Sequence, residues 1–198
     1  MNEPSGRAST LRERKHQRTR DAIVAAAHEL FAERGFDGVT VMDIAERAEV
    51  GRATFFRYFG DKQEVLFGDE RELELVVAEA GRHSMDAPLG DSLKVALDLV
   101  RTIVVAFVER VTAQPEAYSL HERLVAQHPE LQARSLTKQR RYAEELTKVL
   151  LAKGADDTIA ALASEAGLAC YYAARTVTDD DPERLPRAVD DAFDRLLA

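Results

Sequence analysis

The stretch from Thr40 to Phe59, TVMDIAERAEVGRATFFRYF, constrains the fold more than any other part of this sequence. Thr40 is followed three residues later by Asp43, a capping-box pattern in which each side chain bonds the other's backbone N–H at a helix start. Apolar residues at helical spacing follow, and the run stops at residues 49–51, where Gly51 suits the N-cap of a second helix. The stretch therefore predicts two short helices joined by a tight turn.

The second of these helices has two chemically different sides. Its apolar and aromatic members are Ala53, Phe55, Phe56 and Phe59, and its hydrogen-bond donors are Arg52, Thr54, Arg57 and Tyr58. A short helix with one packed side and one donor-rich side, held across a turn by a partner helix, is the geometry that reads the major groove of DNA. We expect Phe55 and Phe59 to belong to the core.

The run from Phe31 to Leu66, FAERGFDGVTVMDIAERAEVGRATFFRYFGDKQEVL, resembles the DNA-binding domain of TetR-family transcriptional repressors. The residues that carry the resemblance are Gly35-Phe36 after the first helix, the TV-x-DIA start of the second and the T-F-x-x-YF-x-x-K end of the third. The C-terminal part resembles that family only in length and helical character.

The resemblance implies a DNA contact set. Arg52, Ala53 and Thr54 match positions that meet base edges, and a guanidinium at Arg52 can bond guanine bidentately. Thr40 and Lys62 match phosphate-contacting positions, and Tyr58 matches a position that touches the backbone. Arg57 is either a phosphate contact or a solvated charge.

Two positions depart from the family pattern. Phe56 stands where tyrosine is more common, which removes a hydroxyl and leaves stacking or contact with a thymine methyl. Glu49 stands where glycine is common, so a left-handed backbone in the turn would cost some free energy. Neither departure removes the reading helix.

The charge distribution is compatible with a nucleic-acid partner although the net charge is −8. Residues 1–62 hold 11 Lys and Arg against 10 Asp and Glu, a net charge of +1, whereas the remainder holds 16 against 25, a net charge of −9. Residues 1–10 are expected to form a flexible basic arm. Arg7 in that arm either enters a minor groove or belongs to a solvated tail.

The fold class predicted for the whole chain is all-α, with about nine helices. The first helix ends at Arg34 because Gly35 suits the position after a helix, and a capping signature at Asp61 and Glu64 starts a fourth helix, which is expected to run to about Arg82. Five more helices follow, at about 91–112, 114–127, 129–153, 158–177 and 182–197. We expect a helix-turn-helix DNA-binding domain over 11–61 and a helical effector-binding and dimerisation domain over 62–198.

The last two helices are expected to pair with their copies in a homodimer, as the family resemblance implies. A two-fold dimer also suits two half-sites of a palindromic operator in double-stranded DNA, about 34 Å apart. The alternative is that these helices only close the core of one chain.

An unknown small-molecule effector is implied by the resemblance, in a cavity among the fourth to eighth helices. Candidate lining residues are apolar or aromatic, and each has plain core packing as its alternative: Val100, Val104, Phe107, Tyr118, Leu120, Tyr142 and Tyr171. Arg134, Lys138 and Arg141 share one helix face, which is either an anion site or a solvated stripe.

Several function classes are disfavoured. His121 and His128 lack further ligands at metal spacing, no cofactor motif occurs, and no nucleophile–base–acid set surrounds Cys170, so an enzyme is not expected. The single cysteine excludes an intramolecular disulfide, no signal-peptide pattern opens the chain, and the apolar run at 103–108 is too short to span a membrane, so a cytoplasmic location is expected. We expect a repressor released by a small, largely apolar ligand; the alternative is a nucleoid-associated DNA-binding protein without an effector.

Overall fold

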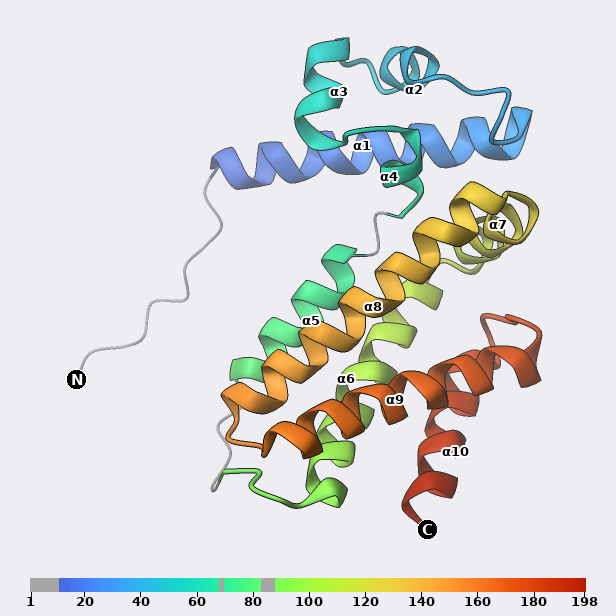
Figure 1. Ribbon diagram of the computed structural model, residues 1–198. Coiled ribbons are helices and arrows are strands. Elements are labelled where there is room, and N and C mark those ends of the chain that lie inside the picture. The colour runs from blue at the N-terminus through green and yellow to red at the C-terminus, as the bar shows by residue number, and fades with distance from the viewer. Residues whose placement is uncertain (1–10, 68–69, 83–87) are drawn as a thin grey trace. The chain divides into compact units, whose positions relative to one another are not determined.

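The computed structural model describes residues 11–67, 70–82 and 88–198, and the chain divides into two compact units, Met1–Gly68 and Asp69–Ala198. The basic arm expected over 1–10, with Arg7, lies outside the described residues. Every regular element in the described ranges is an α-helix, and the single β feature among them is an isolated bridge between Gly90 and Ala155 (Figure 1). The all-α prediction is therefore confirmed.

The first unit contains four helices: α1 (Leu11–Arg34), α2 (Val41–Arg47), α3 (Arg52–Tyr58) and α4 (Lys62–Leu66). The apolar stripe of α1 is buried as its helical spacing predicts, with Ile23, Leu30 and Phe31 each at most 1% exposed. Helix α1 packs against both α2 and α4, and α2 packs against α3. Gly35 follows α1 with φ +72°, a left-handed conformation that glycine adopts without a Cβ clash.

Side-chain caps define the two helix starts that the sequence indicated. At α2, the Thr40 hydroxyl accepts from the Asp43 N–H at 3.2 Å, and the Asp43 carboxylate accepts from the Thr40 N–H at 2.8 Å. At α4, Asp61 accepts from the Glu64 N–H at 2.7 Å, while the Glu64 carboxylate accepts from the N–H of Gly60 at 2.7 Å. Both capping predictions are confirmed, although at α4 the returning bond goes to the residue before the N-cap.

The expected single helix from Lys62 to about Arg82 is wrong, because it is divided into α4 and α5 (Glu70–Arg82). Phe67 leaves helical geometry with ψ 35° and is 4% exposed in the first unit. Gly68 follows it in the sequence, and glycine is a poor helix former. The described residues therefore hold ten helices where about nine were predicted. The chain divides into its two units between residues 68 and 69, whereas the expected boundary was after Asp61.

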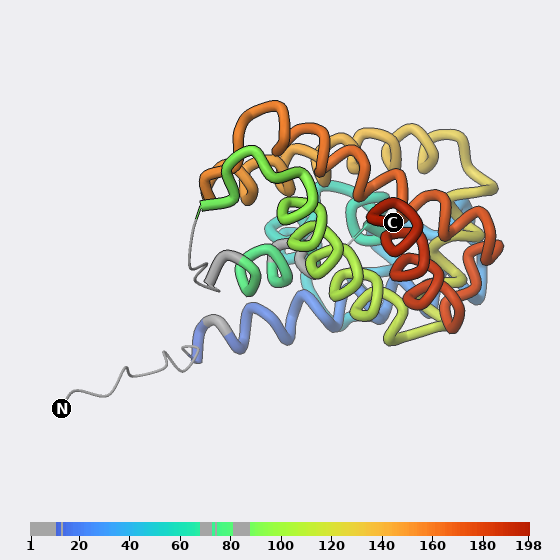
Figure 2. The backbone as a smooth tube through the Cα atoms, turned by 90° about the horizontal axis from the view of Figure 1, so that it is seen from below, coloured from blue at the N-terminus to red at the C-terminus, as the bar shows by residue number. Residues whose placement is uncertain are grey.

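The second unit contains α5, α6 (Leu93–Thr112), α7 (Pro115–Gln127), α8 (Pro129–Ala152), α9 (Asp157–Thr178) and α10 (Leu185–Leu197). The five helices expected beyond residue 91 are all present, and α6 is central because it packs against α5, α7, α9 and α10. Helices α9 and α10 lie beside each other (Figure 2). The last helix begins later than predicted, since a hydrogen-bonded turn from Asp181 to Leu185 precedes it.

Glycine permits a close approach of α6 and α9. A Cβ at Gly167 would lie 2.2 Å from Cγ1 of Val100 and 3.5 Å from Cζ of Phe193. Both neighbours are fully buried, so the glycine lets three helices meet in one core. Among the described residues, no helix is both long and apolar enough to cross a membrane.

Candidate nucleic-acid interface

Helix α3 separates a buried side from an exposed side. Phe55 and Phe59 are 0% and 2% exposed, so the prediction that they are core residues is confirmed. On the other side Arg52, Ala53 and Arg57 are exposed, and Thr54 is half-buried. The two phenylalanines fix the helix on the first unit while the side chains at its N-terminal end face outward, as a groove-reading helix requires.

The turn before α3 is strained in the way the sequence indicated. Glu49 has φ +54°, in the left-handed region that disfavours residues with a Cβ. The turn is held by the Val50 N–H, which donates to the Ala45 carbonyl at 2.9 Å. Gly51 then caps α3 with ordinary backbone angles, and no side chain takes part in that cap. The N–H groups of the first turn of α3 therefore donate no hydrogen bond to a side chain of the N-cap residue.

Phe56 supports Arg52 on the exposed surface. The two residues are four positions apart, and the Arg52 guanidinium carbon lies 5.6 Å from the centre of the Phe56 ring. Phe56 is 45% exposed, so its ring is available to a partner as well as to the guanidinium. Stacking on a ring limits the orientations of a guanidinium and favours bidentate bonding. A phenylalanine at this position thus supports Arg52. The comparison with tyrosine in the sequence concerned only the lost hydroxyl and did not predict this support.

Tyr58 is fixed against the first helix. Its ring centre lies 4.4 Å from that of His16 on α1, and the Arg57 guanidinium carbon lies 5.5 Å from the Tyr58 ring. Tyr58 is half-buried and Arg57 is exposed. Arg57 is therefore the more accessible of these two predicted backbone contacts, and Tyr58 joins α3 to α1.

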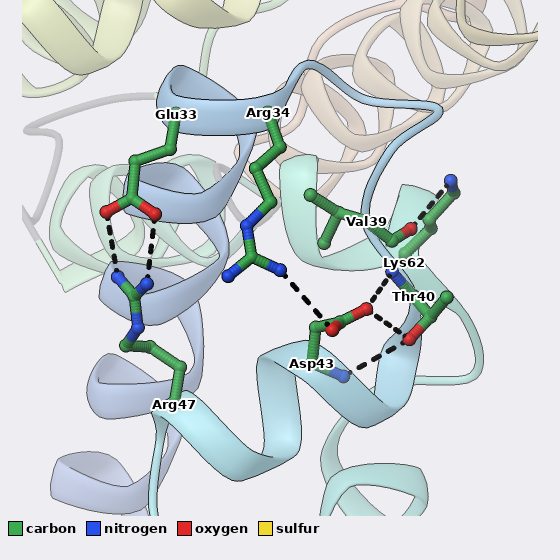
Figure 3. Close-up of polar contacts among 7 residues, drawn as sticks. All are labelled: Glu33, Arg34, Val39, Thr40, Asp43, Arg47 and Lys62. Carbon is green, nitrogen blue, oxygen red and sulfur yellow. Dashed lines mark hydrogen bonds and ion pairs between the residues drawn. The ribbon is translucent and has the colours of Figure 1, made fainter.

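Lys62 binds the protein's own backbone (Figure 3). Its ammonium donates to the carbonyls of Phe36 at 2.8 Å and Val39 at 3.0 Å, and it lies 4.2 Å from the centre of the Phe36 ring. An ammonium has three N–H donors, so two are used by these carbonyls and, among the described residues, one is left for a phosphate. Sequence analysis missed this brace, which joins the start of α4 to the loop between α1 and α2.

Thr40, the second predicted phosphate contact, is exposed at the N-terminus of α2, but its hydroxyl takes part in the capping box. The Asp43 carboxylate also forms an ion pair with the guanidinium of Arg34 on α1, with 3.4 Å between nitrogen and oxygen. The hydrogen bond from the Thr40 hydroxyl lowers the pKa of Asp43 below its ordinary value. The Thr40 side chain therefore orients the start of α2, and its backbone N–H is already paired.

Helices α1 and α2 are also joined by ion pairs that sequence analysis did not predict. Arg47 donates to Glu33 through both terminal nitrogens, at 3.1 and 2.9 Å, and to Glu29 at 3.1 Å (Figure 3 shows the Glu33 pair). The hydrogen bond from Arg47 lowers the pKa of Glu33. These groups are exposed, so the pairs orient the helices more than they stabilise the fold. Their only sequence signal is a basic residue at the end of α2.

The predicted effector residues form part of the core of the second unit. Val100, Val104, Phe107, Tyr118, Leu120 and Tyr171 are buried, and Tyr142 is half-buried. The Phe107 ring contacts those of Tyr142 and Tyr171, at 5.6 and 6.5 Å between centres, whereas Val100 lies against Gly167. An aromatic group contributed by α6, α8 and α9 is thus brought together, and whether an effector contacts it stays a prediction.

The basic stripe of α8 is not a uniformly solvated face. Arg141 is exposed, Arg134 is half-buried and Lys138 is 6% exposed, with its ammonium 5.9 Å from the centre of the Tyr142 ring. The exposed Arg141 fits the interpretation of the stripe as a solvated face, whereas the burial of Lys138 does not fit it. Sequence spacing placed the three on one face but could not indicate how far each is covered by neighbouring helices.

Comparison with known proteins agrees with this geometry. Residues 23–67 match the family model described as bacterial regulatory proteins, tetR family. The chain is 32% identical to the putative mycofactocin biosynthesis transcriptional regulator MftR of Mycobacterium tuberculosis over 147 residues, covering 73% of this chain and 70% of MftR. It is 43% identical to the transcriptional regulator TcmR of Streptomyces glaucescens over 86 residues, which are 40% of this chain and only 38% of the length of TcmR.

A solved structure shares the fold. The SmeT–triclosan complex superposes with a TM-score of 0.58 at 21% sequence identity, covering 90% of each chain. Identity this low supports the architecture alone. The similarity extends well beyond residues 23–67, so the second unit also has a counterpart among solved structures.

Proposed function

Because the chain belongs to the tetR family of bacterial regulatory proteins and is a transcriptional regulator, we propose that it represses transcription as a homodimer on a palindromic operator. A small, largely apolar molecule releases it from DNA. The matched relatives are transcriptional regulators and not enzymes, and none is described as an architectural DNA-binding protein. This action would place the protein in the cytoplasm with the DNA.

One observation carries the DNA-binding proposal: α3 exposes Arg52 and Ala53 while Phe55 and Phe59 are buried beneath it. Arg52 reads a guanine, with Ala53 and Thr54 beside it at the base edges. Arg57, Tyr58 and Phe56 contact the DNA around this centre, and Thr40 and Lys62 lie at the two ends of the unit. The third N–H of the Lys62 ammonium, which bonds no residue in the described ranges, is sufficient for one phosphate.

Exposed apolar side chains on the last two helices support the dimer. Leu162 and Val177 on α9 are 50% and 70% exposed, and Leu196 on α10 is 47% exposed. Small exposed residues at Ala169 and Ala173 lie between the first two along α9 and permit close helix approach. Exposed apolar side chains on two adjoining helices favour an interaction site, and in the proposed dimer a two-fold copy covers them while spacing two reading helices.

Effector release is supported by the aromatic group around Phe107 in the second unit. The SmeT structure, which shares the fold, holds triclosan, so a bundle of this kind can admit a small molecule. A ligand that favours an arrangement with another spacing of the reading helices weakens operator binding. Coupling of about 1–3 kcal/mol is sufficient for such a switch.

Selection of bound fragments from random duplex DNA tests the proposal, together with sedimentation equilibrium of the free protein at micromolar concentration. The expected result is enrichment of an inverted repeat by a two-chain species. Recovery of unenriched DNA refutes sequence-specific regulation, and a single-chain species refutes the homodimer.

A further inference from the structure

The hydroxyl of Tyr118 on α7 is buried without a partner. Tyr118 is 6% exposed, and no described residue offers its oxygen a partner at full hydrogen-bond distance. Burial raises the pKa of this hydroxyl, and the Tyr171 side chain is near enough to offset part of that rise. Most buried polar groups in folded proteins are hydrogen-bonded, because an unpaired one loses its bonds to water and gains nothing. A buried, unpaired hydroxyl next to a group of aromatic rings therefore points to a missing acceptor.

The charged groups near Tyr118 are already paired with one another. Arg175 of α9 pairs with the Glu122 carboxylate on α7 and with Asp180, the latter at 2.5 Å from Nε. Side-chain exposure is only 20% for Arg175 and 13% for Glu122. Because two carboxylates face one guanidinium, a further anion would be repelled here, and a cation would have to compete with the arginine. This end of the helix bundle thus favours an uncharged ligand.

The rings nearby suit a flat partner. Phe107 meets Tyr171 at 72° and Tyr142 at 63°, so the three rings stand edge to face and not stacked. The Arg175 guanidinium carbon lies 5.6 Å from the centre of the Tyr171 ring, which fixes that ring at the charged end. Rings packed edge to face present both faces and edges, which an aromatic molecule inserted among them can contact.

We propose that the effector is an uncharged aromatic molecule whose carbonyl or ether oxygen accepts a hydrogen bond from the Tyr118 hydroxyl. This inference rests on the proposed function, since it names the chemical class of the releasing molecule. The aromatic part contacts Phe107, Tyr142 and Tyr171, and the oxygen gives the buried hydroxyl the acceptor it lacks. Burial raises the pKa of Tyr118, so its hydroxyl keeps the proton it donates at neutral pH.

A matched pair of probes tests the hydrogen bond. 9-Fluorenone and fluorene have the same three-ring shape and differ in one group, a carbonyl in place of a methylene. Binding of each is measured by equilibrium dialysis to the wild type, to Tyr118→Phe and to the control Tyr172→Phe, which removes a hydroxyl from a half-buried position on α9. The wild type and the control should bind fluorenone roughly fivefold to tenfold more tightly than fluorene, the gain typical of one neutral hydrogen bond.

Tyr118→Phe should abolish that preference and leave fluorene binding unchanged. Its melting temperature should equal or exceed that of the wild type, because a phenylalanine removes a buried hydroxyl that has no partner. A lower melting temperature would show that the hydroxyl is bonded within the protein and would overturn the inference. Absence of binding by both probes, equal binding of the two, or a preference that survives in Tyr118→Phe would overturn it as well.

Operator binding separates this inference from the function on which it rests. If the wild type fails to enrich any DNA sequence, the proposed regulator itself is refuted. If it enriches an operator but shows no carbonyl preference through Tyr118, only the effector class is refuted.

Discussion

Replacing Lys62 with methionine should destabilise the first unit as well as weaken DNA binding. The ammonium donates to two carbonyls, Phe36 at 2.8 Å and Val39 at 3.0 Å, and Lys62 is half-buried. Hydrogen bonds to a charged group contribute about 1.5–3 kcal/mol each, and partial solvent access reduces the pair to a total of about 1–3 kcal/mol. Methionine keeps an apolar stem over the Phe36 ring, so the loss is confined to the polar bonds.

Native-state hydrogen exchange read by mass spectrometry on peptides from α1 and α4 measures this loss in the first unit alone. Arg57→Met is the matched control, because it removes one exposed positive charge from the same surface and should change protection by less than about 0.5 kcal/mol. Both variants should bind DNA more weakly. If Lys62→Met leaves protection unchanged and lowers affinity only as much as Arg57→Met, Lys62 is a simple phosphate ligand and the brace is refuted.

Three further predictions concern packing, backbone strain and pH. Gly167→Ala should destabilise the second unit by about 1–3 kcal/mol in urea unfolding, since its Cβ would lie 2.2 Å from Cγ1 of the buried Val100, while Glu109→Ala at an exposed site of α6 should have little effect. Equal stability of Gly167→Ala would mean that α6 and α9 can separate freely. Glu49→Gly should raise the stability of the first unit by about 0.5–1 kcal/mol, because φ is +54° there, and a decrease would contradict the strain. The pKa of Asp43 is lowered by its bond to the Thr40 hydroxyl. The cap therefore stabilises α2 fully at pH values above the ordinary aspartate pKa, and this stabilisation is lost as the pH falls through the lower pKa of the folded state. Exchange of the α2 amides followed from pH 6 to 3 should show that loss in the wild type and not in Asp43→Asn, and identical profiles would exclude Asp43 as its source.

Local features were predictable from the sequence because their causes lie within a few residues. The capping box at Thr40 and Asp43, the glycine after α1 and the left-handed turn at Glu49 each follow from short-range backbone and side-chain chemistry. The burial of Phe55 followed from helical spacing alone. These features gave the reading helix and its orientation within the first unit.

Features that depend on distant partners were not predictable. The Lys62 ammonium bonds carbonyls 23 and 26 positions away, and Arg47 reaches Glu33 and Glu29 across 14 and 18 positions. The break between α4 and α5 coincides with the burial of Phe67, which helical periodicity does not predict. Such contacts arise from tertiary packing, and single-sequence patterns contain no information on which side chains meet.

Base-by-base affinity on the selected operator, measured for the wild type and Arg52→Ala, tests most directly that α3 reads DNA in a two-fold dimer. The account predicts that Arg52→Ala loses about 1–3 kcal/mol and relaxes the preference at one base pair in each half-site, at symmetry-related positions. An unchanged sequence preference, or a uniform loss at every position, would contradict the assignment of the exposed face of α3 as the reading surface.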